Sequence, residues 1–236
     1  MDTLEHYVRD NSRPQGEALD WLERQSWLRT SHGRQLCGPS VGALLRELVR
    51  LLQPRRVLEI GTFSGYSAIW MAGALPEGGR LDTIEINDEL EELIREGFDR
   101  AGLADRIRLV IGDALDILPM IDETYDLVYI DGNKREYIAY YQSVINLVRP
   151  GGYIVADNVL WNGKVSGNIP EDVFGGVSDG VSGGVSGSGS HAAGCEPPRD
   201  QQTVGILAFN DLVAGDDRVE NFILPLRDGL HIIRKK

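Results

Sequence analysis

The chain has 236 residues, of which 42% are hydrophobic and 25% charged, and its formal net charge is −12. This length is enough for one large α/β domain with a sizeable core. The acidic excess disfavours a general nucleic-acid-binding role, because binding to phosphates needs a basic face. Cys37 and Cys195 are too few and too far apart for a disulfide framework, so we expect a reducing, cytoplasmic setting. The start resembles no signal peptide and no apolar stretch could span a bilayer, so no membrane role is expected.

The first 53 residues are expected to form N-terminal helices. Gly38-Pro39-Ser40 is a helix start signal, and leucines recur at helical spacing between residues 44 and 52. Strands and helices then alternate. The predicted strands cover 56–60, 81–86, 107–111, 125–130 and 152–156, and the predicted helices cover 67–74, 89–101, 114–121 and 137–148. Pro150-Gly151-Gly152 is expected to end the last of these helices and to start the strand after it. Such alternation predicts a parallel sheet with helices on both faces.

The last part of the chain has a different pattern. Two apolar runs, 218–226 and 230–233, are joined by Arg227-Asp228-Gly229, which predicts an antiparallel hairpin. Residues 173–194 are dominated by Gly, Ser and Val, which is typical of a flexible insert with little to bury. This insert is interpreted either as a tolerated surface insertion or as a lid that orders over substrate.

A glycine turn follows the first predicted strand. Gly61 and Gly65 permit a tight turn before a helix, where free N–H groups can meet an anion. The spacing is not that of a nicotinamide fingerprint, which disfavours a dehydrogenase. Glu85, at the end of the next strand, suits the two hydroxyls of an adenosine ribose. Beyond the third strand, Gly112-Asp113-Ala114 could pack its backbone on an adenine ring and could cap a helix through Asp113, and the two interpretations are compatible.

Two aspartates end consecutive hydrophobic runs, at Asp131 and at Asp157, and Asn158 follows the second. Carboxyl ends of parallel strands meet at one edge of a sheet, where open α/β sheets bind ligands. Two carboxylates and an amide oxygen there suit a hard divalent cation. Lys134 would reach the same pocket, where a cation would disfavour its ammonium form and allow it to accept a proton. Trp161 could provide an aromatic wall or pack within the loop, and the four histidines show no ligand spacing.

These segments together resemble the cation-dependent O-methyltransferases of the catechol and caffeoyl-coenzyme A type. The resemblance covers most of the chain from Pro39 onward apart from the insert. The motifs that carry it are Val57-Leu58-Glu59-Ile60-Gly61-Thr62 with Gly65-Tyr66-Ser67, Ile130-Asp131-Gly132-Asn133-Lys134, Ala156-Asp157-Asn158-Val159-Leu160-Trp161-Asn162-Gly163, and the ending from Arg218 through Leu224-Pro225-Leu226 to Asp228-Gly229-Leu230. It implies a single methyltransferase domain over residues 1–236, with a Rossmann-like, seven-stranded, mostly parallel α/β sheet, helices on both faces and a C-terminal antiparallel hairpin.

The resemblance also implies a donor, a metal and a base. The donor is S-adenosylmethionine, and the cation is Mg²⁺, with Ca²⁺ or Mn²⁺ as alternatives. The implied donor-binding residues are Cys37, Glu59, Gly61, Thr62, Ser67, Glu85, Ala114 and Asp131. The implied metal ligands are Asp131, Asp157 and Asn158, and the implied base is Lys134. A homodimer is expected from the family.

The acceptor implied by the resemblance is a small phenol with two adjacent hydroxyls. Gly132-Asn133 departs from the small and acidic residues often found there in the plant branch, which disfavours a coenzyme A ester. A hydroxylated uridine in transfer RNA is an alternative, for which Arg24, Arg29, Arg34 and Arg46 would supply a local basic face. A cofactor-binding protein without catalytic activity is the third alternative.

Overall fold

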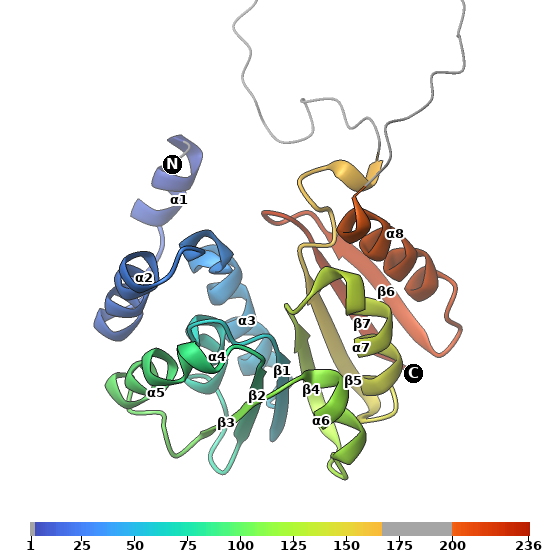
Figure 1. Ribbon diagram of the computed structural model, residues 1–236, viewed down its shortest axis with the longest axis horizontal. Helices are drawn as coiled ribbons and strands as arrows, with labels where there is room; N and C mark the ends of the chain where they lie inside the picture. The colour runs from blue at the N-terminus through green and yellow to red at the C-terminus, as the bar shows by residue number, and fades with distance from the viewer. Residues whose placement is uncertain (1–2, 167–199) are drawn as a thin grey trace, which may run out of the picture.

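The computed structural model describes residues 3–166 and 200–236, so the predicted insert at 173–194 lies outside the described residues. Within the described ranges the strands form one sheet in the order β3-β2-β1-β4-β5-β7-β6 (Figure 1). The strands are β1 (Arg56–Ile60), β2 (Arg80–Glu85), β3 (Ile107–Ile111), β4 (Tyr125–Ile130), β5 (Val148–Asp157), β6 (Val219–Leu224) and β7 (Leu230–Lys235). The first five pair in parallel, whereas β7 is antiparallel to both β5 and β6. The predicted fold class is confirmed.

Helices cover both faces of the sheet (Figure 1). On one face lie α2 (Glu17–Arg29), α3 (Gly38–Leu52), α4 (Tyr66–Ala72) and α5 (Glu91–Arg100), with α1 (Thr3–Asp10) preceding them in the chain. On the other lie α6 (Ala114–Ile117), α7 (Tyr137–Val144) and α8 (Gln201–Ala214). Short 3₁₀ turns occupy Gly33–Gln35, Asp88–Leu90, Leu118–Met120, Lys134–Glu136 and Lys164–Ser166.

The core has two halves because successive strand residues point to opposite faces. Val57 of β1 and Leu127 of β4 pack with α2–α5, whereas the next residues, Leu58 and Val128, pack with α6–α8. Each central strand is therefore buried on both sides, which explains why these segments are almost continuously hydrophobic. Among the described residues, no helix is long and apolar enough to cross a membrane.

The fifth strand begins earlier than the sequence pattern indicates. The prediction that Pro150-Gly151-Gly152 ends the helix and starts the strand is wrong, because β5 already begins at Val148 and α7 ends at Val144 instead of reaching residue 148. Pairing with β4 begins between Tyr125 and Val148, breaks in register, and resumes beyond the glycines. Gly151 has a φ of 76°, which a side chain would disfavour, and a proline is tolerated at such an irregularity.

Candidate active site

The two strand-end aspartates lie at the same edge of the sheet. Ile130 of β4 is in register with Ala156 of β5, so Asp131 and Asp157 follow on adjacent parallel strands. The residue Asp157 is only 2% exposed. Its Oδ2 accepts a hydrogen bond from the Tyr129 hydroxyl (2.7 Å), and its Oδ1 accepts one from its neighbour's backbone N–H (2.7 Å). Burial, and then repulsion from Asp131, raise the pKa of Asp157 to about 7.

Lys134 is held beside the first of these carboxylates. It opens the 3₁₀ turn after β4 and is buried. Its Nζ donates to Asp131 Oδ1 (2.7 Å) and to the Tyr137 hydroxyl (2.7 Å). Asn133 accepts a hydrogen bond from the Arg135 backbone N–H (3.3 Å) and so caps the turn. The lysine and the aspartate that the motif placed three residues apart therefore form a partly buried ion pair.

The segment after Asp157 is an unusual turn. Asn158, Trp161 and Asn162 all have positive φ values, of 59°, 48° and 52°. Among the described residues, the side-chain amide of Asn158 has no hydrogen-bond partner, so its oxygen is available to a ligand. Trp161 lies under Lys164 Nζ (5.9 Å from the ring centre), which is a packing contact within the loop.

Hydrogen bonds to the turn between β6 and β7 hold the segment after Asp157 in place. The backbone oxygens of Asp228 and Gly229 accept hydrogen bonds from Leu160 (2.9 Å) and Val159 (3.1 Å). The Asp228 carboxylate accepts a further one from Asn162 (2.5 Å). Burial raises the pKa of Asp228, and the hydrogen bond from Asn162 and the charge of Lys134 act against the shift. The sequence pattern indicated Asp228 only as a turn residue, because nothing local links it to residue 162.

The glycine turn approaches the aspartate edge closely. Gly61 has a φ of 90°, and a side chain there would come within 2.4 Å of the Asp131 backbone oxygen. Glu59, which is fully buried in β1, accepts hydrogen bonds from the hydroxyls of Ser67 (2.6 Å) and Thr83 (2.6 Å). Burial raises the pKa of Glu59 to about 8 although both hydroxyls act against the shift. Thr62 is also buried and its hydroxyl contacts that of Thr83.

Glu85 has a structural contact that the sequence did not reveal. Its Oε2 accepts hydrogen bonds from the backbone N–H groups of Thr62 (3.1 Å) and Phe63 (2.7 Å), and its Oε1 accepts one from Asn87 (2.9 Å). Phe63 has a φ of 50°, so the carboxylate holds the glycine turn in a strained conformation. The predicted contact of Glu85 with a ribose would add to these bonds.

Two further predicted donor-site residues lie at helix starts. Ala114 is buried at the first position of α6, and Asp113 caps that helix by accepting a hydrogen bond from Leu115 (2.8 Å). The capping interpretation of Asp113 is thus confirmed. Cys37 precedes α3, and the pKa of its thiol is raised by burial and then by the charges of Asp157 and Asp131.

Arg227 joins the N-terminal helices to the terminal hairpin. Its guanidinium donates to the backbone oxygens of Cys37 and of Leu36 (3.3 Å for Leu36). Gly38 has a φ of 77°, and a side chain there would collide with Arg227 Nη1. These residues are almost 190 positions apart, so the sequence offers no signal for this contact.

The chemistry of the aspartate edge fits a hard cation. Among residues 3–166 and 200–236, no three His, Cys, Asp or Glu side chains form a metal-binding cluster. The predicted ligand set has only two carboxylates, with an amide oxygen as its third member. Repulsion between Asp131 and Asp157 contributes to the raised pKa of Asp157, and a divalent cation would remove that repulsion. Oxygen donors of this kind are those that Mg²⁺, Ca²⁺ and Mn²⁺ prefer.

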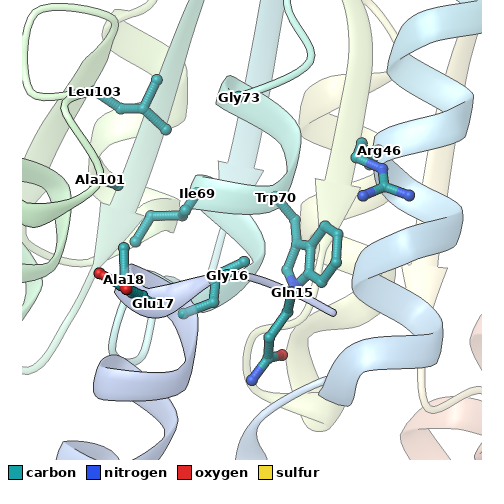
Figure 2. Close-up of a pocket in the computed structure, with 11 residues that line it drawn as sticks. Gln15, Gly16, Glu17, Ala18, Arg46, Ile69, Trp70, Gly73, Ala101 and Leu103 are labelled. Atoms are coloured by element: carbon teal, nitrogen blue, oxygen red, sulfur yellow. The ribbon is translucent and has the colours of Figure 1, made fainter. Parts of the chain in front are cut away.

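One hollow in the described part of the chain lies away from these residues. A cavity of about 270 Å³ lies between α2, α3 and α4, where Arg46 covers the ring of Trp70 at 5.0 Å (Figure 2). None of the predicted site residues lines it. Arg46 also pairs with Glu47, and Arg29 pairs with Glu96, so two of the four arginines considered for a basic face are already paired. His231 is buried between Asn210 and Asn221, where burial lowers its pKa to about 4.

Comparison with known proteins gives one consistent result. Residues 10–174 match the model of a family described as O-methyltransferase. A catechol O-methyltransferase of Niastella koreensis is 38% identical over 169 residues, which cover 70% of this chain and 76% of that protein. Caffeoyl-CoA O-methyltransferase 1 of Nicotiana tabacum is 32% identical over 250 residues, which cover 99% of this chain and 92% of that protein.

Solved structures agree with these matches. The O-methyltransferase TomG of Streptomyces achromogenes, involved in tomaymycin synthesis and solved with S-adenosylmethionine, is 30% identical and has a TM-score of 0.82, covering 100% of this chain and 96% of that one. An O-methyltransferase of Bacillus cereus, solved with S-adenosylhomocysteine, is 29% identical with a TM-score of 0.80 and covers 99% of this chain and 97% of that one.

Proposed function

The chain belongs to the O-methyltransferase family and uses S-adenosylmethionine, and we propose that it methylates a hydroxyl of a small catechol-like phenol with the help of a divalent cation. One observation carries the proposal beyond the family. Asp131 and Asp157 end adjacent parallel strands in register, with Lys134 paired to the first of them. The two carboxylates would stabilise a bound positive ion, and that ion could in turn bind the hydroxyls of a ring.

We propose that the donor lies along the ends of β1, β2 and β4. Its amino-acid part would meet Glu59, Gly61, Thr62 and Ser67, and its ribose would meet Glu85. The adenine would lie near Ala114, with Cys37 and Asp131 beside the sulfonium. The close approach of the glycine turn to Asp131 supports this arrangement, because it leaves only backbone between the two sides of the site.

The cation would be bound by Asp131, Asp157 and Asn158. When bound, it would lower the pKa of the phenolic hydroxyls and fix their position. The bound cation would also disfavour the ammonium form of Lys134, and the neutral Nζ beside Asp131 is the proposed recipient of the hydroxyl proton. The acceptor oxygen then attacks the methyl carbon in line. The new C–O bond forms as the C–S bond breaks, which yields a methyl ether and S-adenosylhomocysteine.

Most of the rate would come from holding the two reactants together. Oriented pairs of reactants can recover about 7–11 kcal/mol of the barrier. The residues that would do this here lie on strand ends and on short turns that hydrogen bonds fix, as for Asp157 and Lys134. Rigid elements of this kind are suited to holding two reacting groups in contact.

A methyl-transfer assay tests the proposal. Catechol and radiolabelled S-adenosylmethionine would be incubated with the chain in EDTA, and again after Mg²⁺ is restored. We expect methyl transfer only when the metal is present, with the methyl group on one of the two phenolic oxygens. Transfer at an unchanged rate in EDTA would contradict the role of the cation.

The acceptor class is tested in the same assay. Unmodified catechols, a caffeoyl-coenzyme A ester and transfer RNA from a strain that lacks the modification would be compared at equal concentration. We expect the catechol to be preferred, since two of the four arginines considered for an RNA-binding face are paired with carboxylates. Methylation of the RNA alone would replace the proposed acceptor with a hydroxylated uridine.

A homodimer is part of the proposal. Trp27 and Leu28 on α2 are 55% and 68% exposed, and Tyr7 on α1 is 66% exposed. Exposed large apolar side chains on these two helices favour an interface. Size-exclusion chromatography with light scattering would test it, and a monomeric mass at every concentration would contradict it.

A further inference from the structure

Tyr137 connects the lysine of the site to the edge of the sheet. It is fully buried at the first position of α7, with its ring packed edge-on against Phe209 at 5.3 Å. Its hydroxyl accepts a hydrogen bond from Lys134 Nζ (2.7 Å) and donates one to the backbone oxygen of Asp157 (2.8 Å). The backbone oxygen of Ile130 is 3.3 Å from the same hydroxyl. The phenol therefore touches the ends of both strands that carry the aspartates.

We propose that Tyr137 is a positioning residue that holds Lys134 Nζ at the reacting edge of the sheet. This inference rests on the methyl transfer proposed above. A lysine side chain has four rotatable bonds and loses much rotamer freedom when its amine is fixed. The ion pair with Asp131 alone would tie the amine to a carboxylate that can rotate about its own side-chain bonds. The bond to Tyr137 ties it to strand-end backbone instead, which is fixed by the sheet.

The Tyr137 hydroxyl uses both its donor and its acceptor capacity in these contacts. A phenol has one hydrogen to donate, and here that hydrogen goes to Asp157 O, which leaves the oxygen lone pairs for Lys134. Phe209 contacts the ring and would do so equally well if the hydroxyl were absent. Removal of the hydroxyl should therefore keep the packing and release the amine.

Tyr141 provides a matched control. It lies one turn later on α7, is fully buried, and packs on the same Phe209 at 6.1 Å. Its hydroxyl donates to Asp216 Oδ2 (2.8 Å), away from the strand ends that carry Asp131 and Asp157. Tyr141→Phe thus removes a buried hydroxyl from the same helix without touching Lys134.

The full-length chain and its Tyr137→Phe and Tyr141→Phe variants would be compared with Mg²⁺, catechol and S-adenosylmethionine. We expect kcat to fall roughly 10- to 100-fold in Tyr137→Phe, because a reacting group displaced by about 1 Å can cost that much. KM for each reactant and the affinity for S-adenosylhomocysteine should stay within about threefold. Tyr141→Phe should keep the kcat of the parent, and its melting temperature should fall by about as much as that of Tyr137→Phe.

A double-variant cycle asks whether the tyrosine acts through the lysine. In a Lys134→Met background, Tyr137→Phe should change single-turnover transfer by less than about twofold, because the group it positions is gone. An equal loss in both backgrounds would overturn the inference, as would a kcat for Tyr137→Phe within twofold of the parent. Lack of transfer to any acceptor by the parent chain would reject the proposed function and this inference together. Normal transfer by the parent with an unaffected Tyr137→Phe would reject this inference alone.

Discussion

Two aspartates on neighbouring strands have opposite electrostatic environments. Asp126, near the start of β4, accepts hydrogen bonds from the backbone N–H groups of Arg55 (2.8 Å) and Arg56 (2.9 Å) and from the Arg149 guanidinium (2.5 Å). Partial burial acts against the ionised form, but these donors outweigh it and lower the pKa of Asp126. Asp157, at the end of β5, has a pKa raised to about 7 by burial and by Asp131.

The difference separates a structural carboxylate from a candidate binding carboxylate. At the amino edge of the sheet, Asp126 has enough donors to stabilise its charge within the protein. At the carboxyl edge, Asp157 has a phenol and one backbone amide, and another carboxylate close by. A buried carboxylate that its own protein stabilises poorly is the one that a bound cation would stabilise most.

The largest expected effect is on catalysis at the carboxyl edge. Asp131→Ala and Asp157→Ala should each reduce methyl transfer by at least about 100-fold, because even residues behind a metal's ligands are typically worth 10- to 100-fold. Asp131→Ala should weaken binding of both Mg²⁺ and S-adenosylhomocysteine, whereas Asp157→Ala should mainly weaken the metal. Calorimetric titrations would measure this, and an equal loss of S-adenosylhomocysteine affinity in the two variants would contradict the division of roles. Asp126→Ala is the matched control and should bind both ligands like the parent.

The next effect is on stability without metal. The ordinary pKa of an aspartate is 3.8 and that of Asp157 in the folded chain is about 7, so between these values the folded state holds a proton that the unfolded state has released. Stability of the metal-free chain should therefore fall as the pH rises from 4 to 7. Asp157→Asn removes this loss and should be more stable than the parent at pH 8 by at most about 4 kcal/mol.

Urea unfolding in EDTA at pH 4 and pH 8 would measure the difference. The gain should be present at pH 8 and absent at pH 4, because at pH 4 the Asp157 carboxyl of the folded parent is protonated and uncharged, like the amide that replaces it. A variant that is no more stable than the parent at pH 8 would show that Asp157 is stabilised within the protein after all.

The smallest expected effect is a loss of folding stability, opposite in sign to the effect of Asp157→Asn. Asp126→Asn should destabilise the chain by about 1 kcal/mol at pH 7, since it weakens the charge-assisted bonds with Arg149 and two backbone amides at a partly exposed site. The pKa of Asp126 is lowered on folding, so its contribution is present above 3.8 and is lost as the pH falls through the folded-state value. The same urea titrations measure it. A gain in stability would remove the contrast with Asp157.

The strand boundaries show how far sequence patterns reach. The segments 56–60, 107–111 and 125–130 form strands with the predicted limits, because each is a short β-rich run. The predicted start of β5 is wrong, because Pro150 and Gly151 are tolerated at a break in register that depends on pairing with β4. The insert at 173–194 lies outside the described residues, so its role stays a prediction.

The candidate site shows the same limit. The spacing of Asp131 and Lys134 is local, and the structure forms that pair. The contacts of Tyr137 with Asp157, and of Arg227 with Cys37, join elements that are 20 and 190 residues apart. No local periodicity carries such contacts, because they depend on how strands are ordered in the sheet.

The sequence by itself determined that two carboxylates reach one edge of the sheet. Parallel strands joined by helices must end on the same side, so Asp131 and Asp157 follow from their places after two hydrophobic runs. Only the tertiary structure decided which aspartate has too few donors to offset its burial and the neighbouring carboxylate. Asp126 receives its donors from β1 and β5, and Asp157 is enclosed with another carboxylate beside it. The charge of a carboxylate is stabilised or destabilised by groups within a few ångströms in space, and those neighbours come from distant parts of the chain.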